Sequence, residues 1–136
     1  MQTEFEKDLI NADSLTLAQE AVKILIEKKG VDVKLFDVRE TSAITDFYIN
    51  VTGRSSLHVS SLADEMDFTL CERGAKPGKI EGKRGNSWLL IDYIDVIVNV
   101  FDKEARGFYD FERLLPKESM VDISDLAKAV DEKFSK

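Results

Sequence analysis

Cysteine, proline and long apolar runs are scarce in this sequence of 136 residues, which holds one cysteine and two prolines. The single cysteine, Cys71, cannot form a disulfide within the chain, and this favours a reducing compartment. No apolar run approaches the roughly 20 residues that a membrane-spanning helix needs. Residues 1–13 are polar and acidic, and we expect this stretch to be loosely held. It lacks both the apolar core of a secretory signal and the arginines of a transit peptide. We therefore expect a cytoplasmic protein that makes no contact with a membrane.

Positively charged residues are also fewer than negatively charged ones. The sequence has 19 Lys and Arg against 26 Asp and Glu, which gives a formal net charge of −7. Nucleic-acid binders usually carry a basic face, so we expect little direct contact with nucleic acid. The best candidate for a local basic patch is 76–84, although a solvated loop and strand edge is the commoner origin of such a run. An acidic surface suits a basic protein partner instead, because complementary potentials speed encounter and select partners.

Nucleophile and metal motifs are missing as well. The one histidine, His58, and Cys71 fall on a single expected helix, 13 residues apart. At about 1.5 Å of rise per residue they lie roughly 20 Å apart, which excludes a catalytic dyad within the chain. The sequence contains neither CxxC nor HExxH.

The turn "TGRSS", residues 52–56, lies between an expected strand and a helix N-terminus, where backbone amides can hold an anion. Nucleotidyltransferases place a Gly-Ser element there and an Asp-x-Asp pair on the next strand to hold magnesium. In this chain the next segment is a helix, and the later pair, Asp92 and Asp95, has the wrong spacing. A residual enzyme or nucleotide-binding protein that uses residues 52–56 remains the alternative interpretation.

The apolar pattern predicts the element order α β β α β β β α α. Helices are expected from Ser14 to Gly30, from Ser55 or Ser56 to Gly74, over 103–115 and from Ile123 onward; strands over 31–38, 47–52, 79–82, 87–92 and 95–101; and a hairpin turn over 83–86. In the first strand, Val31, Val33 and Leu35 are expected on one face. The second helix is expected to carry one apolar stripe, and the strand over 95–101 is expected to be buried on both faces. We therefore predict one α/β domain (α+β-like), with a mixed sheet of about five strands and flanking helices.

The segment "WLLIDYIDVIVNVF", residues 88–101, carries the candidate site. Trp88, Leu90 and Asp92 share one face of their strand by the period of two. Asp92 and Asp95 flank the expected turn between two strands, where Asp is common. Their position favours a structural turn or a docking edge over a metal site.

Two longer segments, 37–66 and 79–114, together with the opening helix, resemble the Iojap family, also called ribosomal silencing factor S. The resemblance covers Ser14 to Leu115 and rests on ordered motifs: D-x-R after the first strand, D-[FY]-[FVI] leading into TG-x-S, the W-x-L-x-DY-x-D-V-x-V strand pair, and FY-x-[LF]-E. It divides the chain into an N-terminal extension (1–13), the family domain (14–115) and a C-terminal tail with an amphipathic helix (116–136).

The resemblance implies a bacterial cytoplasmic protein that is not an enzyme and binds no cofactor. Its fold would be nucleotidyltransferase-like and would lack the catalytic metal carboxylates. Family members bind the large ribosomal subunit through ribosomal protein uL-fourteen, block joining of the small subunit and slow translation when nutrients are short. They are commonly homodimers when free.

The docking surface implied by the resemblance maps onto the strand pair and its neighbours. Its candidate residues are Trp88, Leu90, Asp92, Tyr93 and Asp95, with Asp46 and Arg39 as secondary candidates. Periodicity alone fits Trp88 and Leu90 equally well as core residues, and Arg39 fits an ion pair with a nearby carboxylate.

The sequence departs from the family pattern at three positions. Ile94 stands where Gly is common, Asn99 where His is frequent and Leu115 where many members have Trp. The first two are expected to change local packing, and the third to reshape a partner contact if that Trp reaches the ribosomal protein.

Overall fold

A computed structural model of the chain describes residues 8–82, 85 and 87–134. Its elements follow the chain as α1 (Ser14–Glu27), β1 (Val31–Asp37), β2 (Phe47–Gly53), α2 (Ser56–Glu72), β3 (Lys79–Gly82), β4 (Trp88–Asp92), β5 (Val96–Asp102), α3 (Lys103–Tyr109), the 3-10 helices η3 (Phe111–Leu114) and η4 (Lys117–Ser119), β6 (Met120–Val121) and α4 (Ser124–Phe134). The predicted order is confirmed, and β6 is an additional short strand.

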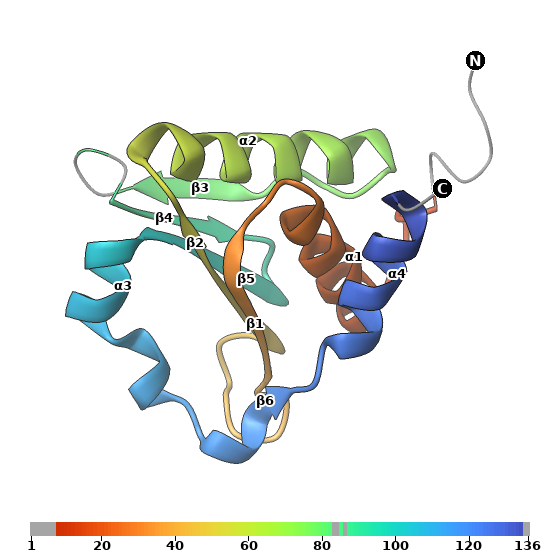
Figure 1. Cartoon of the computed structure of the whole chain (residues 1–136). Helices are drawn as coiled ribbons and strands as arrows, with labels where there is room; N and C mark the ends of the chain where they lie inside the picture. Colours follow the sequence, from red (N-terminus) through yellow and green to blue (C-terminus); the bar gives the residue numbers. More distant parts are fainter. Residues whose placement is uncertain (1–7, 83–84, 86, 135–136) are drawn as a thin grey trace.

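One sheet of six strands, in the order β3-β4-β5-β2-β1-β6, forms the centre of the molecule (Figure 1). β2 and β5 pair in parallel, and all other neighbours pair antiparallel. The sheet is therefore mixed, as the sequence predicts. Of the expected hairpin turn between β3 and β4, Lys83, Arg84 and Asn86 lie outside the described residues.

Helices α1 and α2 cover one face of the sheet, and α4 packs against α1 (Figure 1). The predicted apolar stripe of α2 is confirmed: Val59, Leu62, Ala63, Met66 and Leu70 are all buried. The stripe meets the alternate residues of β5 (Val96, Val98 and Val100) in one hydrophobic core. Every residue of β5 from Val96 to Phe101 is buried, which confirms that this strand is covered on both faces.

Side-chain caps fix the start of both long helices. The Ser55 side chain accepts a hydrogen bond from the His58 amide at the start of α2, as the sequence predicts. Asp13 caps α1 in the same way through the amide of Thr16.

The sequence predicts a loosely held N-terminal stretch, and the structure corrects this for residues 8–13. Leu9 is buried in the core, and its amide donates to the Arg73 carbonyl at 2.8 Å. The guanidinium of Arg73 in turn binds the Asp8 carboxylate at 2.8 Å. Residues 8–13 are therefore anchored to the end of α2.

The predicted alternation in β1 is wrong at its start. Asp32 has a φ of 52°, and the register against β2 shifts between Val31 and Lys34. This β-bulge places Val31 opposite Thr52, on the other sheet face from Leu35. A left-handed Asp in a strand leaves no apolar signature, so the pattern of the sequence could not predict it.

The helix expected over 103–115 is also shorter than predicted. α3 ends at Tyr109 because Asp110 adopts the left-handed conformation, with a φ of 46°, and η3 follows. We call residues 103–119 the strap, because α3 and the 3-10 helices cross the sheet face opposite α1 and α2 (Figure 1). We call that sheet face the strap face. No helix in the described part of the chain is long and apolar enough to cross a membrane.

Candidate partner-binding surface

Trp88 lies half-buried on the strap face, at the start of β4. Its ring centroid is 4.7 Å from that of Tyr109 in the strap and 5.1 Å from that of Phe101 in β5. Leu90 follows on the same face and is also half-buried. The two residues thus combine a packing role with a partly exposed surface.

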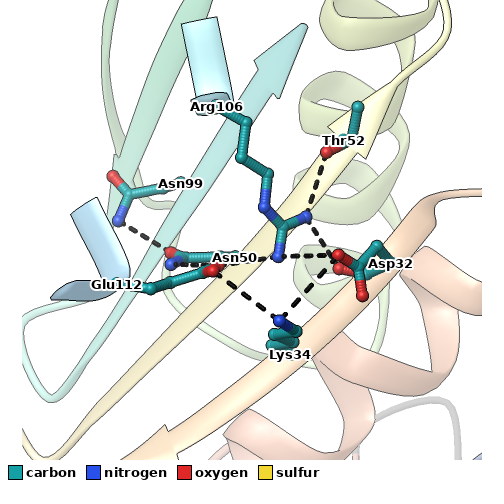
Figure 2. Close-up of polar contacts among 7 residues, drawn as sticks. All are labelled: Asp32, Lys34, Asn50, Thr52, Asn99, Arg106 and Glu112. Carbon is teal, nitrogen blue, oxygen red and sulfur yellow. Dashed lines mark hydrogen bonds and ion pairs between the residues drawn. The ribbon is translucent and has the colours of Figure 1, made fainter. Parts of the chain in front are cut away.

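A polar network runs beneath the strap from the sheet to η3 (Figure 2). The side chain of Asn99 donates to Asn50 at 3.0 Å, and that of Asn50 donates to the Glu112 carboxylate at 3.1 Å. Arg106 closes the network: it donates to Glu112 at 2.7 Å and to the Thr52 hydroxyl at 3.0 Å. Both asparagines are fully buried, so these bonds satisfy amides that would otherwise be costly to bury.

Neither asparagine of this network is among the candidate residues predicted from the sequence. Asn50 and Asn99 interrupt otherwise apolar strands at positions that pair with each other across β2 and β5. Two amides at matching places in neighbouring buried strands are a usable signal, because each needs a partner. Lys34 adds a further cation, 3.8 Å from Glu112.

The turn between β4 and β5 is held by its own polar groups. The Asp92 carboxylate accepts the Ile94 amide at 2.7 Å, and the Tyr93 amide donates to the Val96 carbonyl at 2.9 Å. Ile94 has a φ of 77° and is 76% exposed. A β-branched residue in the left-handed region is an outlier that costs about 1–2 kcal/mol. The turn thus carries strain at an exposed apolar side chain.

The start of β2 joins this turn. The Asp95 carbonyl accepts the amides of Asp46 and Phe47 at 3.0 and 3.1 Å, while Asp95 itself is exposed. The Asp46 carboxylate accepts the Ser14 hydroxyl at 2.7 Å. Two separate segments, 44–47 and 92–96, therefore bring three Asp residues to one end of the sheet.

Arg39 makes the ion pair that the sequence suggested as its structural role. Its guanidinium binds both carboxylate oxygens of Asp37, at 2.7 and 3.0 Å, and lies 4.9 Å from the ring centroid of Phe47. The hydrogen bond from Arg39 lowers the pKa of Asp37 from its ordinary value. We call the set Arg39, Asp46, Asp92, Ile94 and Asp95 the turn surface.

Tyr93 points away from this set and toward α2. Its hydroxyl donates to Asp67 at 2.7 Å, and the Gly78 amide donates to the same carboxylate oxygen at 2.9 Å. Burial, with the bond to Asp67, raises the pKa of Tyr93 far above its usual value. The structure therefore separates Tyr93 from Asp92, and one flank of Tyr93 lines a cavity of about 380 Å³ together with Asp95 and Leu17.

Several polar groups of residues 52–56 are engaged within the chain. The Arg54 amide donates to His58 Nδ1 at 2.9 Å, and Ser55 caps α2. A cavity of about 650 Å³ lies beside this turn, and Arg106 in its wall is paired with Glu112. Within residues 8–82, 85 and 87–134, no three His, Cys, Asp or Glu side chains gather to hold a metal ion.

The geometry defines a class of protein: a mixed α/β domain with one six-stranded sheet, which brings Asp46, Asp92 and Asp95 together at one end. The chain belongs to the family of ribosomal silencing factors, because the family model described as "Ribosomal silencing factor during starvation" matches residues 11–136. This confirms the resemblance drawn from the motifs. Plant relatives carry the name Iojap.

Individual relatives agree with this assignment. The chain is 37% identical to "Ribosomal silencing factor RsfS" of Haemophilus influenzae over 101 residues, which cover 74% of this chain and 98% of that protein. It is 35% identical over 98 residues to the protein of the same name from Halalkalibacterium halodurans, covering 72% and 84%. A crystal structure of a Chromobacterium violaceum protein matches with a TM-score of 0.73 at 29% identity and covers 76% of this chain and 87% of that one.

Proposed function

We propose that this protein binds the large ribosomal subunit through ribosomal protein uL-fourteen, blocks joining of the small subunit sterically and represses translation under nutrient limitation. The observation that carries the proposal is the family match over residues 11–136. The mechanism requires neither a cofactor nor catalysis, because the bound protein and the small subunit compete by mass action. Its place of action is the bacterial cytoplasm.

The turn surface supports the choice of a basic protein as the partner. Asp46, Asp92 and Asp95 come together at one end of the sheet, and Leu90 lies two residues before Asp92 on the same strand face. Acidic groups around a partly exposed apolar residue complement a basic ribosomal protein and guide its orientation. Direct contact with nucleic acid is a minor part of this interface.

The remaining candidate residues take supporting roles in the proposed interface. Trp88 contributes the exposed part of its ring to the interface, while the rest of the ring packs on Tyr109 and Phe101. Tyr93 anchors the turn from the α2 side through Asp67, and Arg39 orders the neighbouring loop through Asp37. Their substitution weakens binding through the shape of the surface.

A charge reversal tests the docking assignment. Asp95 holds β2 through its backbone carbonyl and exposes its side chain, so Asp95→Lys leaves the fold intact. We expect binding to purified large subunits to weaken by about tenfold or more, which corresponds to ~1.4 kcal/mol. Asp64→Lys, at an exposed position of α2, is the matched control. Co-sedimentation of the Asp95 variant at the wild-type level would reject the docking surface.

Subunit joining tests the mechanism separately. Titration of the protein into a mixture of small and large subunits should reduce the joined-ribosome peak in a sucrose gradient. Excess small subunit should restore this peak, since the two ligands compete. A protein that binds large subunits and leaves the joined peak unchanged would contradict the steric mechanism.

The resemblance also supports a homodimer for the free protein. Light scattering on a size-exclusion column should then give about twice the chain mass of 15.4 kDa. A monomeric mass at micromolar concentration would contradict the dimer and leave ribosome binding unaffected.

A further inference from the structure

We propose that Ile94 is a specificity-determining anchor: it inserts into an apolar pocket, rimmed by basic groups, on the ribosomal protein that the turn surface binds. The inference rests on the proposed function and deepens it. It names a residue at which this chain departs from the family pattern and the shape that its partner must present.

The first observation is the conformation of Ile94. Its φ of 77° lies in the region that favours glycine, and a branched Cβ makes that region more costly still. The side chain is 76% exposed, so burial within the chain does not offset this cost. Backbone strain at an exposed apolar residue is a ground for inferring a function.

The second observation is the way the turn fixes the direction of the side chain. The Asp92 carboxylate accepts the Ile94 amide at 2.7 Å, and the Asp95 amide donates to the Tyr93 carbonyl at 2.9 Å. Tyr93 is itself tied to Asp67 of α2. The backbone on both sides of Ile94 is therefore held, and an anchor that is ordered before binding loses little entropy when it docks.

The third observation is the charge around the anchor. Asp95 follows Ile94 directly, the Asp92 carboxylate accepts the Ile94 amide, and the Asp46 amide is bonded to the Asp95 carbonyl. An apolar residue inside a partly exposed acidic rim matches the usual anatomy of an interface, with a dry centre and a polar edge. The complementary surface is an apolar pocket with Lys or Arg at its border.

Two substitutions separate the anchor from the turn. Ile94→Gly relieves the backbone strain and removes the side chain, while Ile94→Asn keeps a residue that tolerates the left-handed region. Both should raise the midpoint of urea denaturation, since the costly conformation is relieved. Both should also raise the Kd for purified large subunits, by about tenfold, because an apolar contact is lost.

Two controls assign the cause. Leu57→Ala removes another exposed apolar side chain, 78% exposed at the start of α2, and should leave the Kd unchanged. Asp95→Asn should weaken binding more at low salt than at high salt, whereas the loss in the Ile94 variants should persist at both.

The outcomes are distinct. Ile94 variants that fold more stably yet bind more weakly support the anchor. A wild-type Kd in the more stable Asn variant would overturn it, because the side chain would then contribute nothing to the interface. Failure of the wild-type protein to bind large subunits would instead overturn the proposed function.

Discussion

The indole Nε1 of Trp88 donates a hydrogen bond to the side-chain oxygen of Asn99 at 3.0 Å, from β4 to a diagonal position on β5. Asn99 is fully buried and passes the chain of bonds on to Asn50. The candidate docking residue Trp88 is thereby connected to the network that holds the strap. Many family members are expected to carry His at position 99. In this chain the Asn99 amide accepts the hydrogen bond from Trp88 and donates one to Asn50.

Removal of the Asn99 amide should therefore destabilise the whole network. We expect Asn99→Ala to lower the free energy of unfolding by about 2–3 kcal/mol, because the bonds from Trp88 Nε1 to Asn99 and from Asn99 to the buried Asn50 Oδ1 are both lost. Trp88→Phe, which keeps an aromatic ring but removes the donor and shortens the ring system, should cost about 1–2 kcal/mol. In the double variant the two losses should overlap by about 1 kcal/mol in urea denaturation. Strictly additive losses would show that the two side chains are not coupled.

The strap should loosen when its ion pair is broken. Arg106 is 12% exposed in its side chain and binds Glu112 at 2.7 Å, so Arg106→Met leaves a partly buried carboxylate with fewer partners. We expect a loss of about 2 kcal/mol in the free energy of unfolding and faster chymotrypsin cleavage at Phe108, Tyr109 and Phe111.

Arg113 offers a matched control in the same segment. Its side chain is 67% exposed, and its nearest contact to Asp110 is 3.9 Å long. Arg113→Met should change stability by less than about 0.5 kcal/mol and leave cleavage unchanged. Equal sensitivity of both variants to the protease would show that the buried pair does not hold the strap.

Elements with a regular apolar pattern were predictable, because buried positions are occupied by apolar residues at the spacing of the helix or strand. The buried stripe of α2 follows from its apolar residues at helical spacing, and the burial of β5 on both faces follows from its nearly continuous apolar run. The left-handed residues Asp32, Ile94 and Asp110 were not predictable, since a single φ leaves no periodic trace and none of them is glycine. Each of them changes the path of the chain.

For the candidate residues, only their placement on the strand could be predicted from the sequence. Strand periodicity assigned Trp88, Leu90 and Asp92 to one face, which the alternate burial of β4 confirms. The opposite direction of Tyr93 depends on Asp67, 26 residues earlier, and on the loop at Gly78. Contacts between distant segments of this kind are fixed by packing and not by local pattern.

Substitution in the core of β5 provides a test of the sheet. Val98 is fully buried between Ile49 of β2 and Ile91 of β4. Val98→Asp should unfold the protein, because it buries a charge with no partner. Val98→Ala should cost about 2–3 kcal/mol and retain the far-UV circular dichroism spectrum. A folded Asp variant would mean that this part of the sheet opens to water.

The anchor of the N-terminal segment should depend on pH. Arg73 binds Asp8 at 2.8 Å and Glu20 at 2.8 Å, and its carbonyl accepts the amide of buried Leu9. The hydrogen bond from Arg73 lowers the pKa of Asp8; burial raises that of Glu20, but the bonds from Lys23 and Arg73 outweigh it and lower the pKa. We expect Arg73→Met to cost about 1–2 kcal/mol at pH 7.

The direction of this pH dependence follows from the lowered pKa values of the Asp8 and Glu20 carboxyl groups. Their stabilising effect is complete above the pKa values of the unfolded chain, about 4, and is lost as the pH falls through the lower values of the folded protein. The difference in urea midpoint between wild type and Arg73→Met should therefore be constant from about pH 5 to about pH 8, because both carboxyl groups are ionised there. The difference should shrink as the pH falls toward about 3. An undiminished gap at the acidic end would assign the loss to packing of the arginine stem, because that contribution does not titrate.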